Sequence, residues 1–514
     1  EWLDAPYKAQ QSWSDWHSAM DDLHAFRDPS ILSPEHPSRM RLAYDELLAN
    51  QLTLALVRHR ARKVGGRAYK TDGALRQKII EALPFTLTNA QQEVLTDIDN
   101  DMGTDVRMLR LLQGDVGSGK TVVACIAMMS AIESGAQAAL MAPTEILARQ
   151  HAQSLKPWLD ATGVRSIVMT GRDKGKARET LLQQIRSGGA QVVIGTHAIF
   201  QDTVEYHDLG LAVIDEQHRF GVQQRLQLSG KGKGTDVLVM TATPIPRTLA
   251  LTAYGDMEVS KIGEKPPGRK PIDTRLIPIE KMEDMVGGLA RQIKTDARIY
   301  WVCPLVEESA NSDLAAAEQR AAQLKLRFGD KVAVVHGRMK GPEKDAVMEA
   351  FASGKTQLLV ATTVIEVGVD VPNASLMIVE AADRFGLAQL HQLRGRVGRG
   401  AEKSRCVLVR SAQIGETAKA RLALMRETND GFRIAEEDLK LRGAGEMLGV
   451  RQSGESPFNI ASDEQVREMI GMAADDAKLL LERDGGLTGS RGEAARIALY
   501  LFERDAGVAT LRSG

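Results

Sequence analysis

Two series of short apolar runs constrain the fold of this chain more than any other feature of its sequence. The first series lies between residues 108 and 243, and the second lies between residues 299 and 410. The runs show no alternation of polar and apolar residues, and helix-length stretches separate them. Such runs are typical of parallel strands that helices cover on both faces. The sequence therefore predicts an α/β protein with two parallel-sheet domains in tandem.

The boundaries of these domains follow from length and from one break in composition. A single hydrophobic core does not grow to 514 residues. The stretch "IGEKPPGRKPIDTR", residues 262–275, is rich in proline, glycine and charge and indicates a linker. We expect a helical segment, a first and a second α/β domain, and a C-terminal helical region that contains a hairpin. Their respective ranges are 1–80, 81–265, 266–415 and 416–514.

Composition excludes several classes of protein. With 43% hydrophobic residues, 26% charged residues and a formal net charge of -1, the chain is typical of a globular protein and not of a disordered or wholly basic one. Its three cysteines lie far apart in apolar runs without zinc-ligand spacing, which favours a reducing compartment, the cytoplasm. The uncharged stretch around Cys125 is shorter than the roughly 20 residues that cross a bilayer, and we expect no signal peptide.

Residues 39–63 have apolar side chains at three- and four-residue spacing and predict an amphipathic helix. The end of this helix and the residues after it are basic, with Arg58, Arg60, Arg62, Lys63, Arg67 and Lys70. Two interpretations stay open for this basic end. It is either a solvated helix end that the helix dipole favours, or a contact with a DNA backbone.

The stretch "GDVGSGKT" follows an apolar run and precedes a helical one, which is the setting of a phosphate-binding loop. Its glycines allow backbone N–H groups to converge on phosphate oxygens. We expect Lys120 to supply positive charge to the β and γ phosphates, and Thr121 to supply a hydroxyl ligand for Mg²⁺. The residues expected around the nucleotide are Gly114, Asp115, Gly117, Ser118, Gly119, Lys120 and Thr121.

The stretch "LAVIDEQH" places Asp215 and Glu216 at the end of an apolar run. Acids at strand ends often serve solubility alone, but a phosphate-binding loop upstream gives this pair a chemical role. Asp215 would hold Mg²⁺, and Glu216 would orient and deprotonate the attacking water. The sequence thus predicts phosphoryl transfer to water.

A family resemblance rests on a series of stretches in the order and with the gaps of the superfamily 2 helicases. They are "FTLTNAQ", "GDVGSGKT", "APTEILARQH", "GTHA", "DEQH", "TATPIPRT", "VATTVIEVGVDVPNA" and "QLHQLRGRVGRG". The tail "LKLRGAGEMLGVRQSG" resembles the translocation motif shared by the RecG family and the transcription-repair coupling factors. "TLALTAYGDMEVSKIGEKPPGRKPI" and "LYLFERDAGVATLRSG" resemble the RecG family in particular. The resemblance implies a RecA-like fold for both α/β domains.

The resemblance also implies roles for residues whose spacing alone defines none. Phe85 and Gln91 match the motif that reads adenine, although Gln91 could instead belong to an ordinary helix start after Thr88. The positions that match residues holding one DNA strand by its backbone are Thr144, Arg149, Gly195 and Thr196. The positions that match elements coupling the nucleotide to the DNA are His218, Thr241 and Thr243.

In the second domain, Thr362 and Asp370 match a motif that senses both nucleotide and DNA. Arg396 and Arg399 lie one helical turn apart, and the resemblance assigns them to the γ-phosphate across the cleft between the domains. There they would stabilise charge in the transition state. ATP binding would then join the two domains and hydrolysis would release them.

Taken as a whole, the resemblance implies an ATP- and Mg²⁺-dependent translocase and helicase acting on double-stranded and branched DNA. Stalled forks and Holliday junctions in recombination and repair would be its substrates, and a single-stranded-DNA-binding protein would be a further partner. One alternative is a translocase of the coupling-factor type, although the sequence contains no polymerase-binding domain. Another is an ATP-gated DNA clamp with a decayed ATPase, which the intact Lys120, Asp215, Glu216, Arg396 and Arg399 disfavour.

The sequence departs from the RecG pattern at its start. Members of that family begin with an all-β wedge domain of OB type that splits the arms of branched DNA, and no alternating strands occur before residue 39. The chain begins with Glu1 and not with Met, and residues 1–30 resemble the segment after the wedge. We expect a longer natural protein, and weak discrimination between forked and linear DNA by this chain.

The tail "EEDLKLRGAGEMLGVRQSGE", residues 436–455, begins as an amphipathic helix and is interrupted by glycines. Its apolar residues could simply pack a helical hairpin on the second domain. The glycines favour a second hypothesis, an element that moves with domain closure. In it the helix ending near Arg442 is a lever, paired with acids of a facing helix. The loop at 450–455 would contact the duplex, and Gln452 would hold the loop or touch the DNA backbone.

Overall fold

The structure is a computed structural model. It describes residues 1–25, 29–63, 65–215, 234–246, 251, 257–266, 269–295, 297–304, 310–362, 371, 373–398, 403–442 and 458–504, without the side chains of 60–63, 310–315 and 442. The chain forms two compact units. The smaller unit comprises Glu1–Gly65, Ile245–Glu258 and Leu439–Gly514, and the larger comprises Gly66–Pro244 and Val259–Asp438.

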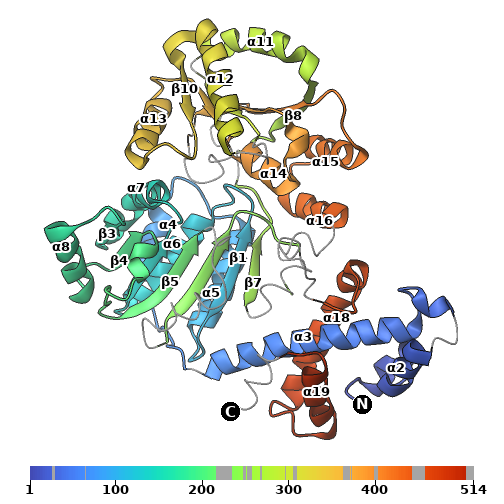
Figure 1. The fold of residues 1–514 in the computed structure, drawn as a ribbon. Helices are drawn as coiled ribbons and strands as arrows, with labels where there is room; N and C mark the ends of the chain where they lie inside the picture. Colours follow the sequence, from blue (N-terminus) through green and yellow to red (C-terminus); the bar gives the residue numbers. More distant parts are fainter. Residues whose placement is uncertain are drawn as a thin grey trace. The chain divides into compact units, whose positions relative to one another are not determined.

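The larger unit contains two β-sheets (Figure 1). The first has the strand order β3-β4-β2-β5-β6-β1-β7. Its strands are β1 (Leu109–Gly114), β2 (Gln137–Met141), β3 (Ser166–Met169), β4 (Val192–Gly195), β5 (Leu209–Asp215), β6 (Asp236–Thr241) and β7 (Glu258–Ile262). The described pairings from β3 through to β1 are parallel.

Both faces of the first sheet are buried, which explains its continuous apolar runs. Leu112 and Val213 point to one face and share a core with helices, whereas Leu111 and Ile214 point to the other face and are fully buried there. The helices on the first face are α4 (Ala74–Ala82), α5 (Asn89–Met102), α6 (Lys120–Glu133) and α7 (Glu145–Thr162). Two further elements are α8 (Gly175–Arg186) and the 3-10 helix η2 (His197–Phe200).

The second sheet has the strand order β10-β11-β9-β12-β13-β8, and all of its pairings are parallel. Its strands are β8 (Asp273–Pro278), β9 (Arg298–Val302), β10 (Val332–Val335), β11 (Leu358–Ala361), β12 (Ala374–Val379) and β13 (Arg405–Arg410).

Helices cover each face of the second sheet. Alternate strand residues such as Tyr300 and Met377 pack with α13 (Gly341–Ser353), α14 (Leu387–Gly395), α15 (Glu416–Glu427) and α16 (Gly431–Arg442). Their neighbours Trp301 and Ile378 pack on the other side with α11 (Met282–Lys294) and α12 (Ala310–Phe328). The 3-10 helices η3 (Ile279–Lys281), η4 (Gly329–Lys331) and η6 (Ala382–Arg384) complete this part. The predicted α/β class with two parallel sheets is confirmed.

The smaller unit is helical and has its own core. It contains α1 (Ala5–Gln10), α2 (Trp16–Ala25), the 3-10 helix η1 (Pro29–Leu32), α3 (Pro37–Lys63), α18 (Asp463–Arg483) and α19 (Ser490–Leu501). The apolar face predicted within residues 39–63 packs here, with Tyr44, Leu47, Leu48 and Leu52 against residues of α18 and α19. The predicted helix is confirmed, but its residues 41–49 are all buried, including Arg41, Asp45 and Glu46, so this part of α3 has no solvent-exposed polar face.

Two residues of the basic stretch after this apolar face bind protein groups. Arg58 lies 3.4 Å from Glu258 Oε1 and donates to the Met257 carbonyl at 3.3 Å. Arg67 is paired with Asp208 and donates to the Ser134 carbonyl. Within the described residues, no helix is long and apolar enough to cross a membrane. All three cysteines are buried free thiols.

Candidate active site

The predicted phosphate-binding loop joins β1 to α6 in a conformation that requires glycine. Gly117 and Gly119 have φ angles of +73° and +88°, in the left-handed region that side chains disfavour. A Cβ on Gly119 would lie 2.2 Å from Gln91 Nε2, and one on Gly114 would lie 2.4 Å from Ser118 Oγ. The loop therefore brings backbone close to its neighbours at each of these glycines.

Lys120 begins α6 and turns its ammonium back over the loop. Its Nζ donates to the carbonyls of Gly114 at 2.7 Å and Asp115 at 3.0 Å, and the residue is 8% exposed. The Ser118 hydroxyl is buried and has no hydrogen-bond partner among the described residues. An ammonium, an unpaired buried hydroxyl and a helix N-terminus at one loop fit a bound polyphosphate.

Gln91 connects the start of α5 to the loop. Its side-chain Oε1 accepts from Thr88 N at 2.9 Å while Thr88 Oγ1 accepts from Gln91 N, so the two form a capping box. Its Nε2 donates to the Ser118 carbonyl at 2.8 Å. Gln91 is thus both a helix cap and a support of the loop. Phe85 is 43% exposed, and adenine contact by Phe85 and Gln91 stays a prediction.

Asp215 ends β5 and contacts a histidine that sequence reasoning missed. His151 Nε2 of α7 lies 2.7 Å from Asp215 Oδ2, and both side chains are nearly buried. The signal was present in "APTEILARQH", where His151 follows the predicted DNA contacts, but no spacing rule connects it to Asp215. A carboxylate and the Thr121 hydroxyl are hard oxygen donors of the type that Mg²⁺ prefers. Glu216 and His218 lie outside the described residues.

Of the predicted DNA contacts in the first domain, Thr144, Gly195 and Thr196 lie at or shortly after strand ends, and Arg149 lies on a helix. Thr144 follows β2 and caps α7, since its hydroxyl accepts from Leu147 N at 3.4 Å. Arg149 on α7 is exposed. Gly195 ends β4, where a Cβ would lie 2.0 Å from the Met169 carbonyl, and Thr196 is buried at the start of η2.

Thr241 is the last residue of β6 and Thr243 lies two residues beyond it, and their hydroxyl oxygens are hydrogen-bonded at 3.0 Å. Thr362 directly follows β11 and is buried. Asp370, Arg399 and Gln452, and the side chain of Arg442, fall outside what the structure describes. Arg396 is the C-cap of α14.

The structure brings α14 of the second sheet against the phosphate-binding loop of the first. His391 Nε2 lies 2.6 Å from Asp115 Oδ1, and both side chains are nearly buried. Burial by itself raises the pKa of the Asp115 carboxyl, but the hydrogen bond with His391 and the charge of Lys265 outweigh it, so this pKa lies well below its usual range. Sequence reasoning missed His391 and Lys265. Asp115 is therefore ionised and turned toward the second domain.

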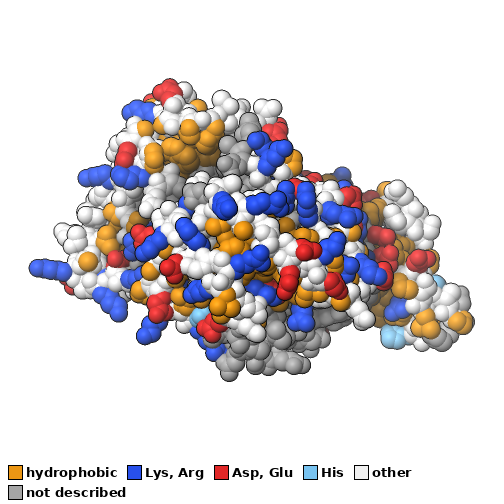
Figure 2. Space-filling view, turned by 90° about the horizontal axis from the view of Figure 1, so that it is seen from above, with side chains coloured by type: hydrophobic (Ala, Val, Ile, Leu, Met, Phe, Trp, Pro, Cys, Tyr) orange, Lys and Arg blue, Asp and Glu red, His pale blue; other side chains and the backbone are white. Residues whose placement is uncertain are grey.

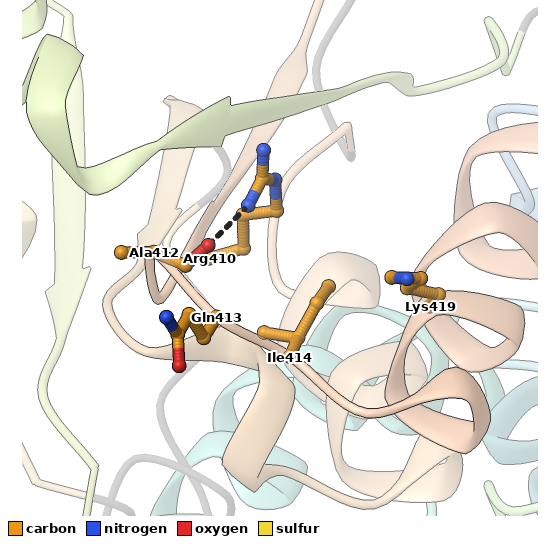
Figure 3. A pocket seen from close by; sticks show the side chains of 5 residues that line it. All are labelled: Arg410, Ala412, Gln413, Ile414 and Lys419. Carbon is orange, nitrogen blue, oxygen red and sulfur yellow. Dashed lines mark hydrogen bonds between the residues drawn. The ribbon is translucent and has the colours of Figure 1, made fainter.

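A pocket of about 510 Å³ lies elsewhere, between the end of β13 and α15. Arg410, Ala412, Gln413, Ile414 and Lys419 line it (Figure 3). Arg410 is turned back onto its own loop, where it donates to the carbonyls of Ser411 and Ala412. None of the predicted site residues that the structure describes lines this pocket.

Family profiles match three parts of the chain. Residues 88–252 match the profile described as DEAD/DEAH box helicase, and residues 280–401 match the helicase conserved C-terminal domain. Residues 428–497 match the profile described as ATP-dependent DNA helicase RecG, domain 3, C-terminal.

Curated relatives named ATP-dependent DNA helicase RecG are similar over most of the chain. The Escherichia coli O157:H7 protein is 51% identical over 83% of this chain and 62% of its own length. The Acidithiobacillus ferridurans protein is 46% identical over 92% and 69%, and the Bacillus subtilis protein is 44% identical over 93% and 70%. The chain thus spans less than two thirds of the Escherichia coli relative.

Solved structures are similar as well. A RecG bound to a three-way DNA junction has a TM-score of 0.73 and 38% identity, over 92% of this chain and 61% of that one. The DUF1998 helicase MrfA bound to DNA has a TM-score of 0.52 and 17% identity, over 73% of this chain and 55% of that one, which shows likeness of fold alone.

Proposed function

Because the chain belongs to the RecG family of ATP-dependent DNA helicases, we propose that it hydrolyses ATP to move along double-stranded DNA and to remodel branched DNA. The observation that carries this proposal is the phosphate-binding loop with Lys120 at the start of α6, facing α14 of the second sheet. Residues 81–265 and 266–415 would act as the two motor domains. Forks and junctions met in repair and recombination would be the substrates.

The loop explains how the chain would hold the nucleotide. The N-terminus of α6 and the N–H groups between Gly114 and Lys120 would receive phosphate oxygens. Mg²⁺, held by Thr121 and Asp215, would supply charge stabilisation at the transferred phosphoryl group. Lys120 would move its hydrogen bonds from the loop carbonyls to the phosphates. Glu216 would orient and deprotonate the attacking water.

The second domain would complete the site. Arg396 is the C-cap of α14, the helix whose His391 touches the loop, so this end of α14 would face the bound phosphates. Arg396 and Arg399 would neutralise the charge that develops during transfer. Nucleotide-dependent contact between the two domains would then alternate, and the grip of each domain on DNA would alternate with it.

DNA would be held mainly by its backbone. Thr144, Arg149, Gly195 and Thr196 offer hydroxyl, guanidinium and N–H donors, which bind phosphates without reading bases. Lys and Arg side chains are also numerous on the face in Figure 2, despite a formal net charge of -1. Local basic surface suffices for backbone binding. The related RecG bound to a three-way junction supports branched DNA as the substrate. A single-stranded-DNA-binding protein is a further partner proposed from the family.

Movement along the duplex would depend on the segment between Arg442 and Phe458. In the smaller unit, Glu46 of α3 accepts hydrogen bonds from the backbone N–H groups of Asn459, Ile460 and Ala461 at 2.6, 2.9 and 2.9 Å. Glu46 is 2% exposed, so these bonds form away from competing water. The chain after the proposed DNA-contact loop is thereby anchored. We propose that Arg442 and Gln452 transmit domain closure to the DNA against this anchor.

The test compares hydrolysis with movement in the same chain. ATP turnover is measured without DNA and with single-stranded, linear duplex and forked DNA, and translocation is measured as displacement of a third strand from a triplex. We expect duplex-stimulated turnover and displacement in the wild type. Arg442→Ala and Gln452→Ala should keep stimulated turnover and lose displacement. No ATP turnover with any DNA would refute the proposed function, whereas a parallel loss of turnover and displacement would refute only the transmission role.

A further inference from the structure

A buried chain of hydrogen bonds joins the phosphate-binding loop to α14. Asp115 Oδ1 accepts from Val116 N at 2.7 Å and lies 2.6 Å from His391 Nε2, and Asp115 Oδ2 lies 3.5 Å from Lys265 Nζ. On the other side of the ring, His391 Nδ1 lies 3.0 Å from Arg394 Nη2. The chain therefore runs from the loop through a histidine to a buried arginine.

The partners of His391 determine which ring nitrogen carries the proton. A guanidinium donates hydrogen bonds and accepts none, so Nδ1 facing Arg394 must be the acceptor. Nε2 then carries the hydrogen and donates it to Asp115 Oδ1. Arg394 is held in turn, because its Nη1 donates to the carbonyls of Met425 and Thr428 at 2.7 and 2.8 Å. His391 thus has a fixed tautomer and a fixed ring orientation.

The surfaces around this hydrogen bond fit closely. A Cβ on Gly395 would lie 2.8 Å from Val116 Cβ in the loop, and one on Gly431 would lie 2.6 Å from His391 Nε2 and 3.0 Å from Pro244 Cγ. Larger residues at these positions would push the second domain away from the first. Gly395 is the last residue of α14, and Arg396 follows it.

We propose that His391 is a positioning residue, whose hydrogen bond to Asp115 sets where the end of α14, and with it Arg396, lies over the phosphate-binding loop. The inference rests on the proposed ATPase function. A carboxylate in a phosphate-binding loop also repels a polyphosphate unless it is turned away and neutralised. His391 holds the carboxylate turned away from the nucleotide site, and Lys265 supplies the opposite charge. Asp115 thereby has a role toward the second domain and not toward the nucleotide.

The test separates turnover from nucleotide affinity. His391→Ala should lower kcat by roughly 10- to 100-fold, since a misplacement of about 1 Å at a reacting centre can cost ~10² in rate. Affinity for a fluorescent ATP analogue should change by no more than about threefold, because the loop itself is intact. His391→Gln, which can still donate to Asp115, should recover part of the loss. His336→Ala, a histidine of the same domain paired with Glu318, is the matched control and should keep full turnover.

A double-mutant cycle tests the pairing itself. If His391 acts through Asp115, then Asp115→Ala with His391→Ala should be no slower than the worse single variant. If the loss of kcat in the double variant equals the product of the two single losses, the proposal is overturned. An unchanged kcat in His391→Ala, measured beside an active wild type, would overturn it as well. An inactive wild type would refute the proposed ATPase function instead.

If His391→Ala does not fold, the variants His391→Gln and Asp115→Asn test the proposal, because both side chains keep the approximate shape of the contact. Wild-type kcat in His391→Gln with full loss of affinity would also contradict positioning.

Discussion

The two sheets of the larger unit have the same strand order and different chemistry. If the strands of each sheet are numbered by their order in the chain, from β1 to β6 in the first sheet and from β8 to β13 in the second, the common order is 3-4-2-5-6-1. In the first sheet, the first strand leads into the glycine loop and Lys120. In the second sheet, β8 leads into Ile279–Lys281 and α11, with Glu283 and Asp284 in the first helical turn. Acids at a helix N-terminus repel phosphate, so of the two sheets only the first has a loop that fits the proposed phosphate site.

The acids at the ends of the central strands differ in the same way. Ile214 pairs with the last residue of β2, and Val379 pairs with the last residue of β9, so Asp215 and Glu380 occupy equivalent positions. Glu380 is held by Arg320 at 2.6 Å and by Trp301 Nε1 at 3.0 Å. A carboxylate in such a bidentate cluster stabilises its own domain. The two domains thus share a fold, and the residues that follow equivalent strands differ between them.

The largest expected effect on ATP turnover distinguishes the loop after β1 from the segment after β8. Lys120→Ala should reduce ATP turnover by more than about 10³-fold, because it removes charge from the transferred phosphoryl group. Lys281→Ala, at the N-cap of α11, should leave turnover unchanged. Steady-state ATP hydrolysis with saturating duplex DNA measures both. Wild-type turnover in Lys120→Ala would contradict the whole assignment of the site.

A smaller loss is expected from the arginines that the second domain contributes. Arg399→Ala should lower kcat by about 10²- to 10³-fold with little change in nucleotide affinity, because a transition-state donor is lost. Arg405→Ala, whose guanidinium pairs with Asp273 on β8, serves as control and should behave as wild type. Equal losses in kcat and affinity would reassign Arg399 to binding of the ground state.

Glu216, which follows Asp215, and Glu380 should respond to the same isosteric change in different ways. Glu216→Gln should bind ATP normally and hydrolyse it about 10² times more slowly, because a general base is removed. Glu380→Gln should keep turnover and lose about 1–3 kcal/mol of stability, the scale of hydrogen bonds to a charged group. Urea unfolding and ATPase assays on both variants check this. A Glu216→Gln protein without nucleotide affinity would show that Glu216 is structural.

The smallest effect is expected at a second contact between the halves of the larger unit. Arg172 lies 2.6 Å from Glu145 and 2.7 Å from Asp345 of α13, and these side chains are partly exposed. Exposed pairs contribute roughly 0–1 kcal/mol and are screened by salt. Arg172→Ala should change turnover by no more than about threefold, and less at high salt. A loss as large as that expected for His391→Ala would show that burial does not separate the two contacts.

Local sequence patterns determined several features of this protein that lie within single elements. Uninterrupted apolar runs predict parallel strands because burial on both faces removes any need for polar alternation, and both sheets confirm it. The glycines of "GDVGSGKT" and the amphipathic face within residues 39–63 are likewise local, and the ordered motifs identified the family that the relatives confirm. In each case the information lies within a few turns of one element.

The partners of the site residues were decided by tertiary structure alone. His391 reaches Asp115 across 276 positions of sequence and His151 reaches Asp215 across 64, and no periodicity connects such pairs. Only folding decided that Glu380 is held by Arg320, or that Arg58 binds Glu258. The physical reason is that strand order sets which loops share an edge of a sheet. A charged side chain then pairs with an oppositely charged side chain that folding brings close to it, even when the two residues are far apart in the sequence.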